Sequence, residues 1–263
     1  MSRTPFGARR RLLYGLAGLA GLLALVEAVP RLGLVDERYL PPATTILATL
    51  ARELATAGLW IALGETLIGW ALGLAIAFFL AVAIGVVIGI VPGLRAATTS
   101  TIEFLRPIPS VALVPLATLL YGPSLSSTLL LVVYASFWQV LIQVLYGVAA
   151  VDSVAYDTAR SYGLGSWSRV RHLIWPTALP YVMTGLRLAA AVAFILAVTA
   201  ELVIGSPGLG AEIQVAQSSG AVPAVYALIV LAGLVGIGVN VAVRFLERRV
   251  LSWHPSVRSE ATT

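Results

Sequence analysis

The 263-residue sequence contains no cysteine and no lysine, so all of its 17 basic side chains are arginine. Without cysteine the chain has no disulfide, no thiolate nucleophile and no cysteine-ligated metal. Without lysine it lacks both the Walker-A lysine that binds nucleotide phosphates and an amine for Schiff-base chemistry. The two histidines, His172 and His254, lie far apart and outside the apolar runs. A catalytic site would need scattered carboxylates and hydroxyls, and we do not expect an enzyme.

Charge is scarce as well. Charged residues make up only 11% of the chain and hydrophobic residues 59%, and the mean hydropathy is +0.94. Because soluble domains are about 25% charged, this composition indicates an integral membrane protein. Six apolar segments are long enough to cross a bilayer as helices: 12–29, 60–91, 97–121, 124–150, 178–205 and 221–246. The first could also be a signal peptide, but its length and the lack of a clear small-residue cleavage site favour a retained helix.

The arginines predict the orientation of the spans. If the N-terminus is cytoplasmic, the cytoplasmic segments carry twelve arginines: Arg3, Arg9, Arg10, Arg11, Arg95, Arg160, Arg169, Arg171, Arg244, Arg248, Arg249 and Arg258. The outer side then carries three: Arg31, Arg38 and Arg52. This bias follows the positive-inside rule, and it accounts for the net charge of +5 without a nucleic-acid partner.

We expect a multi-pass protein of the cell membrane, embedded in the lipid bilayer, with both termini in the cytoplasm. Residues 1–11 would be a cytoplasmic segment and 12–250 the transmembrane domain, which includes a cytoplasmic loop at 152–176. Residues 251–263 would form a cytoplasmic tail.

The loop at 152–176 is predicted to be a helix, a glycine turn and a second helix. An aspartate–serine pair at 152–153 can cap the first helix, and Gly163 can end it in the left-handed conformation. Ser166 can cap the second helix, which Pro176 would close. Ala155 and Ala159 share a small, flat face of the first helix that suits docking into a groove. An ordinary basic loop that serves only membrane topology is an equally weighted alternative.

The same segment resembles the "EAA" loop of ABC-importer permeases, in which E-A-A is followed at fixed spacings by glycine and by I-x-L-P. This chain has Asp157-Thr158-Ala159, then Gly163, then Leu173-Ile174-Trp175-Pro176. It departs from the pattern in Asp for Glu, Thr for the first Ala, and Leu and Trp at the two apolar places.

The resemblance extends in order over about residues 40–255. The segments "LRPIPSVALVPLATLLYG" (105–122), "ALPYVMTGLRLA" (178–189), "TAELVIGSPGLG" (199–210) and "ERRVLSWHP" (247–255) are similar to the nitrate/sulfonate/taurine-type permeases. A further departure is Gly69, where this group leads us to expect arginine.

This resemblance implies an all-α permease of about six transmembrane helices, with the type I ABC importer fold and a cytoplasmic coupling helix between spans four and five. A second copy of the chain, two cytoplasmic ABC ATPases and an extracytoplasmic solute-binding protein would be its partners. The chain would bind no cofactor, since ATP and Mg belong to the ATPase. The coupling residues would be Ala155, Asp157, Thr158, Ala159, Gly163 and Pro176. The solute would be a small anion such as a sulfonate or nitrate, or alternatively a vitamin or its precursor, of the riboflavin or thiamine-pyrimidine type.

Ionisable groups at membrane depth are functional candidates because they are costly there. Glu103 and Arg106, three residues apart, could pair on one helix face. Prolines at 107, 109 and 115 remove backbone donors and should break that helix. Residues 103–115 would then either line a pathway or gate, or form a kink that the ion pair stabilises. Glu201 precedes an irregular stretch at 205–210, which would be an outer gate or a simple loop.

Gln139 and Gln143 lie one helical turn apart and could contact either the solute or a neighbouring helix. The predicted pathway residues are therefore Glu103, Arg106, Pro109, Gln139, Gln143 and Glu201. Two other classes remain open. An ion-coupled secondary transporter would use Glu65 or Glu201 as the ion carrier, and an intramembrane enzyme would need a nucleophile–base pair that the sequence does not show.

Overall fold

The computed structural model describes residues 6–253, so the predictions made for residues 1–5 and 254–263 lie outside the described residues. The described part is helical. Its elements are α1 (Phe6–Arg31), α2 (Ala43–Glu53), α3 (Ala57–Ile90), α4 (Pro92–Leu105), η1 (Ser110–Leu113), α5 (Val114–Tyr121), α6 (Leu125–Ala149), α7 (Ser153–Ser161), α8 (Ser166–Arg169), η2 (Val170–Ile174), α9 (Trp175–Ile204), α10 (Leu209–Ser218) and α11 (Val222–Val250).

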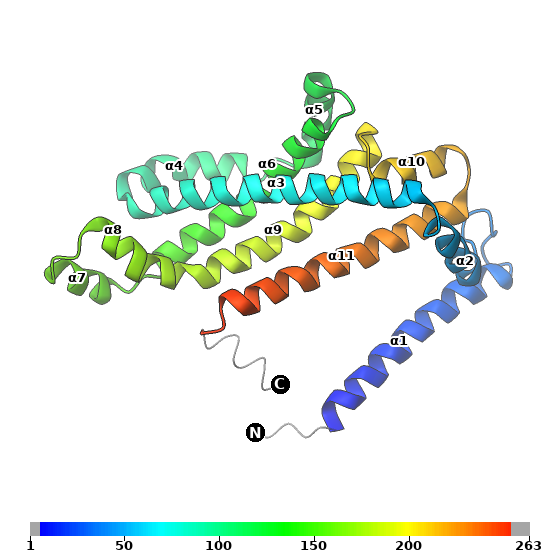
Figure 1. The fold of residues 1–263 in the computed structure, drawn as a ribbon, viewed down its shortest axis with the longest axis horizontal. Helices are drawn as coiled ribbons and strands as arrows, with labels where there is room; N and C mark the ends of the chain where they lie inside the picture. The colour runs from blue at the N-terminus through cyan, green and yellow to red at the C-terminus, as the bar shows by residue number, and fades with distance from the viewer. Residues whose placement is uncertain (1–5, 254–263) are drawn as a thin grey trace.

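Helix α6 is the centre of the bundle. It packs along α3 on one side and along α9 on the other, and α11 lies beside α9 (Figure 1). Glycines make the α3–α6 contact close: Gly73 lies against Val132, and Gly85 against Val144, with no room for a Cβ on either glycine. Small residues at helix interfaces allow such close approach, which favours association through van der Waals contact in lipid.

Within residues 6–253, five helices are long and apolar enough to cross a membrane, and a bent pair, α4 with η1 and α5, makes six if it counts as one span. The predicted span 97–121 consists of two parts that meet at 80°. The break lies where the prolines predict it. Pro107 and Pro109 lack the N–H that would continue the ladder, and the Tyr134 hydroxyl donates to the Leu105 carbonyl at 2.7 Å across the break.

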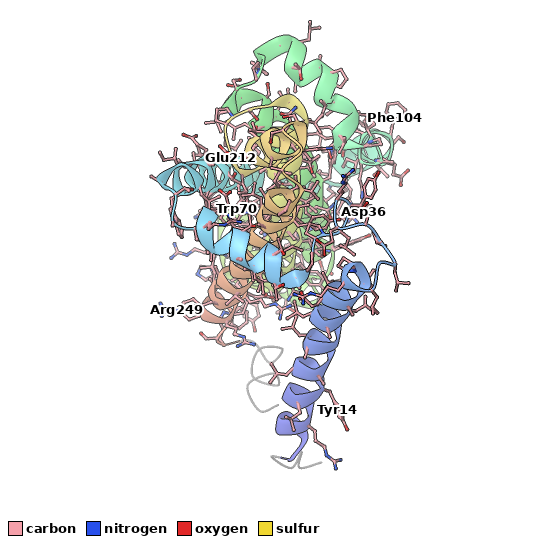
Figure 2. The ribbon with its side chains drawn as sticks, turned by 90° about the vertical axis from the view of Figure 1, so that its right-hand side faces the viewer. Tyr14, Asp36, Trp70, Phe104, Glu212 and Arg249 are labelled. Atoms are coloured by element: carbon pink, nitrogen blue, oxygen red, sulfur yellow. The ribbon has the colours of Figure 1, made fainter. Side chains whose placement is uncertain are left out.

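The end of the bundle that carries α2 and α10 has its own apolar cluster. Ile46 and Leu50 of α2 pack with Leu209 and Ile213 of α10 and with Leu228 of α11. Helix α1 joins this end only. Its Glu27 accepts hydrogen bonds from Thr44 at the start of α2, and the rest of α1 diverges from α11 (Figure 1). Figure 2, which views that end, shows α1 with Tyr14 standing away from the other helices.

Candidate functional site

The segment 152–176 lies at the opposite end of the bundle, where α7 and α8 project beyond the long helices (Figure 1). The Asp152 carboxylate accepts from the Ala155 amide at 2.8 Å and caps α7, as predicted. Gly163 ends the helix at φ +76°, which also confirms the prediction. Gly165 takes an ordinary φ of −62° at the N-cap of α8, and Ser166 follows it without capping the helix with its side chain, so that part of the prediction is wrong.

Pro176 does not close the second helix. The chain stays helical from Ser166 to Ile204 through a π turn, η2, in which the Trp175 amide donates to the Val170 carbonyl. A π turn shifts the hydrogen-bond register by one residue. Pro176 then falls in the first turn of α9, where a missing N–H costs least. The motif's proline therefore marks a change of helix type within one long helix.

The large exposed apolar side chains of this segment do not lie on the helix face that carries Ala155 and Ala159. Ala155 and Ala159 are half-buried, whereas Val154 is 70%, Tyr162 82% and Trp167 75% exposed. Asp157 and Thr158 are exposed as well. We call Val154, Asp157, Thr158, Tyr162 and Trp167 the coupling surface, after the role that the sequence predicts for this segment and that stays a prediction. Large apolar side chains exposed beyond the membrane-spanning region are typical of a protein contact.

Arg169 holds the two helices of the segment together. Its guanidinium donates to the Tyr156 hydroxyl at 3.1 Å and lies 5.0 Å from the centre of that ring, and it also donates to Ser166 Oγ at 3.2 Å. Tyr156 in turn packs on the main core. The coupling surface is thus attached to the bundle through α7, and a displacement of one helix of the segment would be transmitted to the other.

A polar groove separates α4 from α6. It is a cavity of about 580 Å³, and its lining includes Arg95, Thr98, Thr99, Glu103, Arg106 and, from α6, Ile142, Leu145 and Tyr146. The α4 residues recur at every third or fourth position, so they share one face of that helix. No residue of α4 is buried, and a lipid-facing helix of this polarity would be costly. We therefore expect water or a second protein surface along α4.

The structure brings Glu103 and Arg106 to this groove but does not pair them. Neither forms an ion pair with another described residue, so the predicted pairing on one helix face is wrong in this structure. Arg106 is the C-cap residue of α4, directly before Pro107, and the Glu103 and Arg106 side chains are both exposed to the groove. Arg95 is the residue that sequence reasoning missed, because the positive-inside rule accounted for it already. Two guanidiniums and one carboxylate thus line the groove without an ion-pair partner among the described residues.

A second, aromatic cavity lies on the other side of the break. It has a volume of about 620 Å³, and Tyr121, Tyr134, Phe137 and Trp138 contribute to its lining. The same face of α6 borders both cavities, from Ser126 in this one to Tyr146 in the polar groove. That length is about 30 Å at ~1.5 Å per residue, which equals the thickness of a bilayer's hydrocarbon core. Pro109 lies at the break between the cavities.

The predicted glutamines lie elsewhere. Gln139 and Gln143 are half-buried and border neither cavity. Gln143 faces α9, where its Cβ would lie 3.0 Å from a Cβ added to Gly185. This position favours the packing alternative, and a contact with the solute stays a prediction.

Glu201 is 1% exposed and holds the start of α10 to two other helices. Its carboxylate accepts from Thr66 Oγ1 of α3 at 2.8 Å and from the Gly210 amide at 3.0 Å. Thr66 Oγ1 in turn accepts from the Leu209 amide at 2.8 Å. Side chains of α3 and α9 thus cap the first two amides of α10, and the carboxylate lies at the favourable end of its dipole. We call Thr66, Glu201 and the first turn of α10 the outer clasp.

The loop between α9 and α10 fits the clasp through its glycines and a serine. Gly208 lies against the Glu201 carboxylate at φ +149°, where a side chain would have no room. Ser206 is hydrogen-bonded to Thr128 of α6 at 2.8 Å. The irregular stretch that was predicted is therefore a loop anchored to three spans, and its role as a gate stays a prediction.

Replacing Glu201 by alanine should destabilise the fold. The variant leaves the buried Gly210 amide without its acceptor, which costs roughly 1–3 kcal/mol, while the Thr66 hydroxyl can still donate to the Ala62 carbonyl at 3.2 Å. Thermal unfolding of the purified protein measures this. Glu212→Ala, which removes an exposed carboxylate from the same turn of α10, is the matched control and should cost at most about 1 kcal/mol. Equal unfolding temperatures for the two variants would contradict the clasp.

Comparison with known proteins defines the class. Residues 81–252 match the model of the family described as the binding-protein-dependent transport system inner membrane component. The chain belongs to this family. It is 31% identical to the taurine transport system permease protein TauC of Escherichia coli, over 95% of this chain and 92% of that protein. It is 30% identical to the putative aliphatic sulfonates transport permease protein SsuC of Bacillus subtilis, over 97% of this chain and 92% of that protein.

The fold is likewise that of a type I ABC importer permease. A solved chain of the MetNI methionine ABC transporter superposes with a TM-score of 0.62 at 17% identity, covering 73% of this chain and 95% of that chain. The chain is thus an ABC-importer permease subunit that is similar in sequence to permeases named for taurine and aliphatic sulfonates, and the predicted fold class is confirmed.

Proposed function

We propose that two copies of this chain form the translocation pathway of an ATP-driven importer for a small organic sulfonate. The observation that carries the proposal is the face of α6 that borders both cavities, with the unpaired Arg95 and Arg106 along the polar one. Water-accessible guanidiniums along one groove suit a sulfonate, whose three oxygens accept hydrogen bonds from the arginine fork. The relatives that match nearly the whole chain are named for taurine and sulfonates, which supports the same solute class. A vitamin as the solute stays a prediction.

A second copy would complete the pathway. Helix α4 has no buried residue, so the polar groove has an open side in a single chain. Helix α1 is apolar and only 6% buried over its membrane window, and its Gly15, Gly18 and Gly21 contact nothing within 4 Å of an added Cβ. Small residues at such spacing on a membrane helix favour close packing against another helix. Both features support a homodimer.

Two ABC ATPases would dock on the coupling surface at the cytoplasmic end. The exposed Val154, Tyr162 and Trp167 supply the apolar contact, and the arginine bias supports the cytoplasmic orientation of this end and of both termini. The chain contains no lysine, so ATP and Mg would be held by the ATPase. The solute-binding protein would dock at the opposite end, near α2 and α10.

Purification tests this assignment. The isolated chain should hydrolyse no ATP above a protein-free control, because it lacks the phosphate-binding lysine. When expressed with its ATPase, it should be recovered in a complex whose mass corresponds to two copies of each subunit. Native mass spectrometry and phosphate release measure both results. Robust hydrolysis by the isolated chain, or a complex with one permease copy, would contradict the proposal.

A further inference from the structure

A further groove, with a polar part and an apolar part, lies between α9 and α11, away from the two cavities that α6 borders. Its volume is about 350 Å³. The polar part of its lining consists of Arg187, Asn240 and Arg244, and the apolar part includes Leu188, Phe194 and Ile195. The proposed pathway uses none of these residues.

The polar part lies at the depth of a membrane interface. Arg187 is about 25 Å along α9 from its end at Ile204, and Arg244 is about 33 Å along α11 from its start at Val222, at ~1.5 Å per residue. Because a hydrocarbon core is about 30 Å thick, both guanidiniums lie near its boundary. By the arginine bias this boundary is the cytoplasmic one.

The polar part also retains positive charge. Arg187 is 3.3 Å from Glu247, which compensates one guanidinium. Arg244 donates from Nε to the Asn240 amide oxygen at 3.1 Å and forms no ion pair with another described residue. Its terminal nitrogens are thus available to an anion, and the Asn240 contact holds the guanidinium at the groove.

The apolar part continues from these charges toward the middle of the membrane. Ile195 lies about 12 Å outward from Arg187 along α9, and Leu188 lies between them on the exposed side. A free phosphate or a small solute would gain nothing from this wall. A phospholipid has both parts in this order, with its phosphate at the interface and its acyl chain in the core.

We propose that this groove binds an anionic phospholipid of the cytoplasmic leaflet. The headgroup phosphate accepts from Arg244 and from the exposed side of Arg187, whose side chain is 40% accessible. One acyl chain lies along Leu188, Phe194 and Ile195. The bound lipid fills the space between α9 and α11 and holds their cytoplasmic ends at a fixed separation.

Native mass spectrometry of the full-length transporter with phosphatidylglycerol or phosphatidylcholine tests the site. Phosphatidylglycerol should bind more tightly than phosphatidylcholine, and it should raise the unfolding temperature of the transporter in a separate thermal unfolding measurement. Arg244→Gln should lower its affinity about tenfold, the effect of one lost charge-assisted hydrogen bond, and should abolish the temperature shift. Arg244→Glu should weaken binding further. The matched control is Arg249→Gln, which removes the same charge from a residue that stacks on Phe245 outside the groove and should change neither result.

Three outcomes would overturn the proposal. Equal binding of both lipids would show that the headgroup charge is not recognised. Unchanged phosphatidylglycerol binding in Arg244→Gln would place the lipid elsewhere. Because the chain has no native cysteine, Leu188→Cys introduces a single thiol, and a rapid disulfide between two copies would show that a second protein surface covers the groove.

Discussion

Gly163→Val should give a permease that inserts and folds but transports solute at least about tenfold more slowly. Gly163 ends α7 at φ +76°, and its amide and that of Leu164 donate to the carbonyls of Arg160 and Ala159 at 3.0 Å. In that conformation a side chain costs about 1–2 kcal/mol, and a β-branched one more, while 1.4 kcal/mol corresponds to about tenfold in an equilibrium. The variant relieves the strain by turning α7, which moves the coupling surface off its ATPase.

Gly165→Val is the matched control for this result. Gly165 has φ −62°, and a Cβ at either glycine would meet nothing within 4 Å. The two variants therefore add the same side chain to open space and differ only in backbone strain. ATPase co-purification and solute uptake should fall for Gly163→Val and stay near wild type for Gly165→Val.

The topological alternative for the segment 152–176 predicts a different pattern. If the loop only keeps positive charge in the cytoplasm, both glycine variants transport normally. Removing Arg160, Arg169 and Arg171 would then disturb insertion. Normal coupling in Gly163→Val would therefore contradict the docking role of α7.

Arg106→Ala should lower uptake by roughly tenfold to a hundredfold without loss of folded protein. Arg106 forms no ion pair with another described residue and is exposed to the polar groove, so its truncation breaks no internal contact. A lost hydrogen bond to a charged solute costs about 1.5–3 kcal/mol. The loss is measured as uptake of a radiolabelled sulfonate by proteoliposomes that contain the complete transporter. The solute-binding protein is supplied in the same assay.

Two variants separate the charge from the side chain's bulk and from general effects on α4. Arg106→Lys keeps the positive charge but not the planar fork, so it should recover part of the activity. Ser100→Ala changes α4 outside the groove and should transport normally. Full activity of a folded Arg106→Ala would show that the groove is not the solute's route.

Local signals in the sequence predicted most of the backbone. Asp152 as a cap, Gly163 as a left-handed helix end and the prolines at 107 and 109 as a break depend on chemistry within a few residues. These features need no knowledge of the rest of the chain. The prediction that Pro176 ends a helix was wrong, because the π turn before it lets the chain remain helical and leaves Pro176 in the first turn of α9. The residues around Pro176 do not by themselves distinguish a helix end from such a π turn.

The orientation of side chains was less predictable. Spacing places Glu103 and Arg106 on one helix face, but whether they pair depends on the groove that α4 and α6 form. Ala155 and Ala159 are half-buried, whereas Val154 and Tyr162 are exposed, which the spacing of the alanines alone did not predict. Whether the alanines dock against the ATPase stays a prediction.

By itself, the sequence determined that this protein is a helical membrane protein; the orientation of its arginines and a separate ATPase for the nucleotide stay predictions. The membrane class follows from composition and from bilayer thickness, which act on each segment independently. Only the tertiary structure decided which partners the charged side chains of the spans have. Glu201 caps a helix through Thr66, far away in the sequence, and Arg95 joins Arg106 in one groove. Such pairings depend on which helix faces meet, and in a bundle of near-uniform apolar helices that choice rests on side-chain packing across the whole chain.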